Sequence, residues 1–133
     1  MKEILKRAAE FHGHLGPYLV LGMRMGTMAR KTLDATPFEI RAEIRTNDKT
    51  PRSCVLDGIQ FTSGCTLGKR NIELIKSNEI SGAFFKDESK FVINTKKNIL
   101  ERIKTVSDME EYAEELFEKN DEELFEYDTP ETC

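Results

Sequence analysis

The sequence has few of the residues that mark exported or membrane proteins. Its 133 residues include three cysteines, two histidines and no tryptophan. An odd, small number of cysteines argues against the disulfide framework of a small secreted domain. No apolar run approaches the about 20 residues that cross a bilayer, so no membrane segment is expected. The charged first ten residues lack the apolar core of a signal peptide, which predicts a cytoplasmic location.

The charge pattern excludes a second class of function. The net charge is −4, and no basic stripe carries interleaved aromatic residues. We therefore expect no nucleic-acid partner. The length suits one domain, and 38% of the residues are hydrophobic, enough for a core.

Two helices are predicted at the start of the chain. Residues 2–11 have apolar positions at helical spacing. A second helix is predicted from Pro17 to Leu33, because proline suits the first helical position. This helix is apolar almost all round at its start, so we expect it to be buried. Gly22 and Gly26 lie one turn apart on it and suggest close backbone packing, with a partner subunit as one candidate.

The middle and end of the chain alternate strand and helix patterns. Strands are predicted at 38–45, 72–75, 81–85 and 90–94, with a turn at 87–89. Helices are predicted from 52 to Gly64, from 97 to 106, and from the N-cap Ser107 to 119. This order indicates an α+β fold, a small, mainly antiparallel sheet packed with helices in a single domain over 1–119. Residues 120–133 are predicted to form an acidic, mobile tail that ends at Cys133.

The two histidines, His12 and His14, flank the start of the second helix. Imidazole is the commonest metal ligand, and a His-x-His pair in extended backbone can direct both rings to one point. A helix N-terminus beside them also offers free N–H groups to an anion. The alternative is that one or both histidines simply cap the helix.

Cys54 is predicted in the first turn of the third helix, with Asp57 on the same face. That position is expected to lower the thiol pKa and favour thiolate, which is both nucleophile and metal ligand. The alternative is a small, buried hydrophobic residue.

Cys65 is predicted in a loop with Gly64, Gly68 and Lys69. Lys69 could bind an anion or hold Cys65 as thiolate, whereas the alternative is a helix end at Gly64 followed by an ordinary loop. A straight helix over 54–65 would separate the two cysteines by about 16 Å, too far to share one metal. The helix then breaks early, the cysteines serve different sites, or a dimer interface brings them together.

Two motifs resemble the FmdE family of formylmethanofuran dehydrogenase proteins. The first is Phe-His-Gly-His-Leu-Gly-Pro at 11–17, leading into Leu-Gly-Met-Arg-Met-Gly at 21–26. The second spans 54–71, from Cys-Val-Leu-Asp-Gly-Ile-Gln to Thr-Ser-Gly-Cys-Thr-Leu-Gly-Lys-Arg-Asn. Together they resemble the family's core domain, over roughly residues 8 to 95.

The resemblance implies an α+β core, often a homodimer, with a His/Cys cleft for a divalent metal, zinc by default. The metal ligands carried over are His12, His14, Cys54 and Cys65, and the candidate catalytic residues are Cys65, Lys69 and Asp57. The implied partners are molybdenum or tungsten formylmethanofuran dehydrogenase subunits. Many members have a cysteine where this chain has Gly16, and many add a C-terminal zinc ribbon, for which Cys133 alone does not suffice.

Three functions follow as alternatives. One is a metal-dependent oxidoreductase, or an enzyme accessory, of one-carbon metabolism and methanogenesis. Another is a non-catalytic subunit or binding module of a larger dehydrogenase. The third is a metal-free thiol enzyme that uses Cys65 with a histidine as base.

Overall fold

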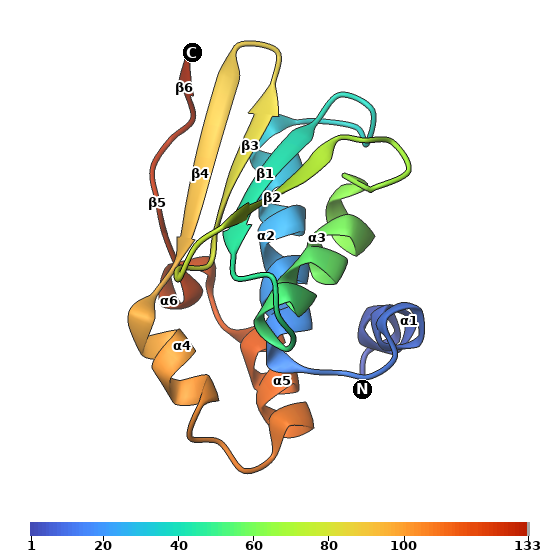
Figure 1. The fold of residues 1–133 in the computed structure, drawn as a ribbon, viewed down its shortest axis with the longest axis vertical. Helices are drawn as coiled ribbons and strands as arrows, with labels where there is room; N and C mark the ends of the chain where they lie inside the picture. Colours follow the sequence, from blue (N-terminus) through green and yellow to red (C-terminus); the bar gives the residue numbers. More distant parts are fainter. Residues whose placement is uncertain (133) are drawn as a thin grey trace.

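The computed structural model describes residues 1–132, which form one sheet with helices against it (Figure 1). The order of the main strands is β2-β1-β3-β4-β5, and β6 also pairs with β4. Only the β1–β2 pair is parallel. The predicted α+β class with a mainly antiparallel sheet is therefore confirmed. The elements are α1 (Glu3–His12), α2 (Pro17–Leu33), β1 (Arg41–Thr46), η1 (Arg52–Cys54), α3 (Val55–Ser63), β2 (Ile72–Lys76), β3 (Ser81–Lys86), β4 (Ser89–Thr95), α4 (Lys97–Ile103), α5 (Met109–Glu118), α6 (Asp121–Leu124), β5 (Phe125–Tyr127) and β6 (Glu131–Thr132).

Helix α2 forms the centre of the molecule. It packs on β3 and β4 on one side and along α3 on another. Twelve of its seventeen residues are buried, as its apolar sequence predicts. Phe84 on β3 and Phe91 on β4 fill the core next to it, each almost fully buried. Burying such a side chain contributes about 1.5–3 kcal/mol.

Helices α2 and α3 touch through their backbones at three glycines. A Cβ added to Gly22 would lie 2.0 Å from the Val55 carbonyl oxygen, and one added to Gly58 would lie 2.0 Å from the Leu19 carbonyl oxygen. A Cβ on Gly26 would lie 3.0 Å from the Ser63 nitrogen. The close packing predicted for Gly22 and Gly26 is thus within the chain, and these glycines give no argument for a subunit interface.

The same contacts set the direction of the two helices. Gly22 faces Val55 at the start of α3, and Gly26, one turn later, faces Ser63 at its end. The helices therefore run parallel, and their amino ends lie at the same end of the molecule. The connection from β1 through α3 to β2 is the crossover that the parallel β1–β2 pair requires.

Several predicted boundaries shift. Strand β1 begins at Arg41, not 38, because the Glu39 N–H donates to the Thr36 carbonyl and closes a turn. Helix α4 ends at Ile103, where the Thr105 hydroxyl and N–H both donate to the Arg102 carbonyl. The N-cap of α5 is Asp108 and not Ser107, since the carboxylate of Asp108 accepts a hydrogen bond from a backbone N–H in the first turn of the helix.

The predicted acidic tail carries regular structure. Asn120 and Glu123 form a capping box that starts α6, and β5 then pairs with β4. Leu124 and Phe125 are buried in the core. These two apolar residues anchor the segment on the sheet, although acidic side chains surround them in the sequence. Cys133 lies outside the described residues.

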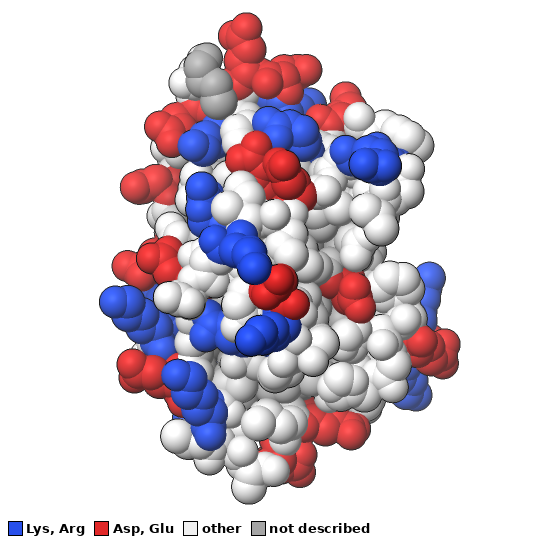
Figure 2. Space-filling view, viewed as in Figure 1, with Lys and Arg blue, Asp and Glu red and all other residues white. Residues whose placement is uncertain are grey.

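The surface seen in Figure 2 mixes both signs of charge. Lys and Arg side chains alternate with Asp and Glu side chains over this face, and no large area carries one sign. Within residues 1–132, no helix is long and apolar enough to cross a membrane.

The glycine contact gives a stability prediction. Replacing Gly58 with alanine should lower the free energy of unfolding by at least about 2 kcal/mol, because the new methyl group would meet backbone atoms of α2. Helix propensity alone predicts the opposite sign, a gain of about 1 kcal/mol. Chemical denaturation would measure the difference.

Gly68→Ala is the matched control. An added Cβ there comes no closer than 4.0 Å to the Thr66 hydroxyl, so we expect a change within about 0.5 kcal/mol. Equal stability of Gly58→Ala and the wild type would contradict the backbone contact.

Candidate functional site

A pocket of about 200 Å³ lies where the amino ends of α2 and α3 meet. It holds both histidines of the chain and one cysteine, with mainly apolar side chains around them. The loop before α2 supplies His14 and Gly16, and the last residue of α1 supplies His12. The lining residues are His12, His14, Gly16, Pro17, Tyr18, Leu19, Pro51, Cys54 and Met109.

The ring of His12 is fixed by a carboxylate. Its Nδ1 lies 2.6 Å from Asp57 Oδ2, and its side chain is only 9% exposed. With Nδ1–H donating to Asp57, the neutral ring presents the lone pair of Nε2. A carboxylate that orients a histidine in this way is the usual outer-shell support of a metal-binding imidazole.

His14 lies beside His12 and is more exposed. The two ring centroids are 5.1 Å apart, and the planes are tilted by 36°. Gly13 between them has φ +120°, a value that suits glycine and turns the chain out of α1. A Cβ at Gly16 would lie 3.2 Å from His14 Nε2. A cysteine at that position, as in many family members, would therefore place its sulfur beside this ring.

Cys54 comes from the other helix, at the end of η1 and directly before α3. Burial is the main cause that raises the pKa of its thiol, and the nearby Asp57 carboxylate raises it further. The expected lowering of the pKa by the helix N-terminus is thus wrong for the metal-free protein. Desolvation and an adjacent negative charge outweigh the helix dipole here.

Cys65 lies at the opposite end of α3. It is fully buried, its N–H donates to the Ser63 hydroxyl, and its Sγ lies 3.8 Å from the Ile40 carbonyl oxygen. Burial raises its pKa, and this outweighs the lowering by the Ser63 hydroxyl and by the charges of Lys69 and Arg30. Lys69 instead donates to the Thr66 hydroxyl at 3.0 Å.

The structure therefore separates the two cysteines. Helix α3 is unbroken over nine residues, about 13.5 Å of rise, and Gly64 caps it with φ +77°. His12, His14 and Cys54 line one pocket, whereas Cys65 and Lys69 are not among its lining residues. Within residues 1–132, no three His, Cys, Asp or Glu side chains are already grouped closely enough to hold a metal. The catalytic roles of Cys65, Lys69 and Asp57 stay predictions.

Sequence reasoning missed three other lining residues, Tyr18, Pro51 and Met109. Tyr18 follows Pro17 on α2, so its place at the amino end was visible in the sequence. Met109 starts α5, far along the chain, and only the tertiary packing of α5 on α2 brings it to the pocket. No local pattern signals such a contact.

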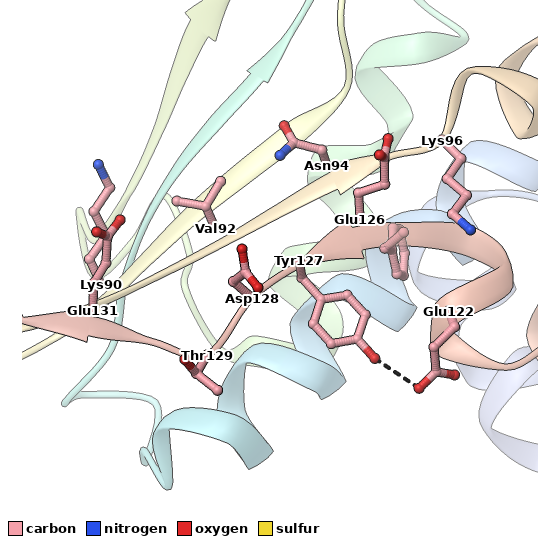
Figure 3. A pocket seen from close by; sticks show the side chains of 11 residues that line it. Lys90, Val92, Asn94, Lys96, Glu122, Glu126, Tyr127, Asp128, Thr129 and Glu131 are labelled. Atoms are coloured by element: carbon pink, nitrogen blue, oxygen red, sulfur yellow. Dashed lines mark hydrogen bonds between the residues drawn. The ribbon is translucent and has the colours of Figure 1, made fainter.

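A larger hollow of about 850 Å³ lies beside β4 and β5 (Figure 3). Its lining mixes lysines with acidic residues and includes no histidine or cysteine. The Tyr127 hydroxyl donates to Glu122 at its border, at 3.1 Å. The lining residues are Lys90, Val92, Asn94, Lys96, Glu122, Phe125, Glu126, Tyr127, Asp128, Thr129 and Glu131. The chemistry-bearing residues thus favour the smaller pocket.

The environment of Cys54 gives a pH prediction. In metal-free protein, labelling of Cys54 by a thiol reagent should reach half its maximal rate above the ordinary cysteine pKa, since the thiolate is the reactive form. Asp57→Asn removes a negative charge that disfavours the thiolate, so the midpoint should shift to lower pH. Mass spectrometry of the labelled peptide measures both midpoints.

Gln60→Asn is the control on the same helix, because it leaves the Asp57 charge in place. A midpoint that does not move in Asp57→Asn would contradict the electrostatic contact between Asp57 and Cys54.

Comparison with known proteins agrees with the two motifs. The family model described as "FmdE, Molybdenum formylmethanofuran dehydrogenase operon" matches residues 11–129. A curated relative from Archaeoglobus fulgidus, named "Probable S-adenosyl-L-methionine-binding protein", is 37% identical over 79 residues. That match covers 54% of this chain and only 20% of the relative. Because the family model covers most of the chain and includes every lining residue of the pocket, this protein belongs to the FmdE family.

Proposed function

We propose that this FmdE-family protein binds a divalent metal, zinc by its donor set, through His12, His14 and Cys54. The observation that carries the proposal is that these three side chains line one pocket, with His12 already oriented by Asp57. The family's association with the molybdenum formylmethanofuran dehydrogenase operon gives the context. The metal site would serve one-carbon chemistry carried out with molybdenum or tungsten formylmethanofuran dehydrogenase subunits.

The donor set suits zinc. Two imidazoles and one thiolate are typical zinc ligands, and three protein ligands leave a position open for a water or substrate. The bound ion would act there as a Lewis acid. Cys54 is held as a neutral thiol without metal, so binding requires loss of its proton, which a dication favours. Since the donors are not grouped in advance, small side-chain movements accompany binding.

Cys65 is left out of the proposed ligand set, because it is fully buried at the far end of α3. The same burial leaves it without a neighbouring histidine base in the pocket, which weighs against the metal-free thiol enzyme. Zinc itself is not redox-active. Any oxidation or reduction would therefore belong to the associated dehydrogenase, with this protein as its accessory. A homodimer stays a prediction.

The printed name of the Archaeoglobus relative suggests a different ligand, S-adenosylmethionine. We do not transfer it to this chain, because the match covers one fifth of that protein. The pocket volume of about 200 Å³ is also below the about 300–1,000 Å³ of sites for ligands of that size.

Cobalt substitution tests the ligand set. We would use Cys133→Ser protein, so that the terminal thiol cannot contribute. Addition of Co²⁺ to the metal-free protein should give one equivalent of binding and a thiolate-to-cobalt charge-transfer band. Cys54→Ser should lose this band, because the only proposed sulfur ligand is gone.

Cys65→Ala is the control cysteine and should keep the band. Loss of the band in Cys65→Ala with its retention in Cys54→Ser would contradict the proposed set. Absence of cobalt and zinc uptake by the folded protein would reject the metal site altogether.

Gly16 offers a gain-of-binding test. Its backbone is extended, with φ −139°, so a larger residue fits the local conformation. Gly16→Cys places a thiol beside His14 and should tighten zinc binding by at least about tenfold, the lower range for outer-shell changes at metal sites. Competition with a chromophoric chelator measures the affinity.

Gly68→Cys adds a thiol in an exposed loop away from the pocket and should leave the zinc affinity unchanged. Equal affinities for Gly16→Cys and Gly68→Cys would contradict the location of the site.

A further inference from the structure

The amino end of α2 carries backbone donors that the chain does not use. Gly16 at the N-cap offers no side-chain acceptor, and the first helical bond runs from Val20 N–H to the Gly16 carbonyl. Pro17 has no N–H. The amides of Tyr18 and Leu19 donate to no acceptor within residues 1–132, and both residues line the pocket. Such N–H groups attract anionic oxygens.

The side chain of Tyr18 is a second, independent donor. It is only 8% exposed and lines the same pocket, yet its hydroxyl has no hydrogen-bond partner among the described residues. A buried phenol nearly always finds a partner, because leaving it unpaired costs about 1–3 kcal/mol. Its ring already packs in the core, so the unpaired hydroxyl points to a ligand oxygen.

The charges around these donors favour an anion. Arg52 lies close enough to Tyr18 to affect its ionisation, and Arg52 Nε is buried without an acceptor in residues 1–132. The two imidazoles add further donors or positive charge. The nearest carboxylate, that of Asp57, is already paired with His12.

We propose that the pocket binds a small monocarboxylate, whose oxygens accept hydrogen bonds from the amides of Tyr18 and Leu19 and from the Tyr18 hydroxyl. This names the ligand class of the site under Proposed function and rests on that function for the metal beside it. The donors described here belong to the chain itself, so the carboxylate binds the metal-free protein as well.

The pocket selects carboxylate over a larger or more highly charged oxyanion. Its volume of about 200 Å³ has room for only a few heavy atoms. Pro17, Leu19, Pro51 and Met109 give it apolar walls, which suit a short alkyl chain and not a phosphate. A dianion would also meet the negative charge of Asp57 near Cys54.

Nuclear magnetic resonance titration tests the proposal. The metal-free protein would be titrated with propionate, with the neutral isostere propionamide and with inorganic phosphate, and the amide signals of Tyr18 and Leu19 followed. Propionate should shift both signals with saturation, and the other two should bind at least about tenfold more weakly. Tyr18→Phe, which removes only the hydroxyl, should weaken propionate binding about tenfold.

Tyr127→Phe is the control, because Tyr127 lies on β5 and hydrogen-bonds Glu122. It should bind propionate like the wild type. Preference for phosphate, equal binding of propionamide, or unchanged affinity in Tyr18→Phe would overturn the carboxylate assignment.

The two proposals fail in different ways. Zinc binding without any propionate shift, in either metal-free or zinc-loaded protein, overturns the carboxylate site and leaves the metal site standing. Saturable propionate binding by a protein that takes up no zinc does the reverse.

Discussion

The backbone contact between α2 and α3 is the constraint on which the candidate site depends. Gly22, Gly26 and Gly58 let the two helices approach until a single added Cβ would overlap main-chain atoms. Because the helices run parallel at this distance, their amino ends open at the same place. The histidine loop before α2 therefore meets Cys54 at the start of α3, although about 40 residues separate them. A spacer of one methyl group between these helices would move the two halves of the site apart.

Within the pocket, the protein balances charge without using a free thiolate. Asp57 orients His12 and at the same time disfavours ionisation of Cys54. The metal-free pocket thus keeps a neutral thiol, two imidazoles and unused N–H and O–H donors. Each of these features becomes favourable when a dication and a carboxylate are added. The proposed metal and carboxylate would complete the same small cavity from two sides.

The sequence was informative where a signal was local. The limits of α2 follow from Pro17 and the apolar run after it, and the α+β class follows from the order of helix and strand patterns. The glycines of α2 predicted close packing, but which surface they met depended on Gly58, a contact across 36 residues of chain. Leu124 and Phe125 were too few to predict that an acidic segment folds onto the sheet. For the candidate site, the motifs predicted His12, His14 and Cys54, whereas the length of α3 alone decides that Cys65 lies elsewhere.

The most direct measurement of the central claim is X-ray absorption at the zinc edge of the zinc-loaded, full-length protein. A site at the shared amino ends of α2 and α3 predicts two imidazole nitrogens at about 2.0–2.1 Å and one sulfur at about 2.3 Å, with the remaining position taken by a light atom. A shell with two or more sulfurs, or one with no sulfur, would show that the helices do not bring these three residues together around a metal.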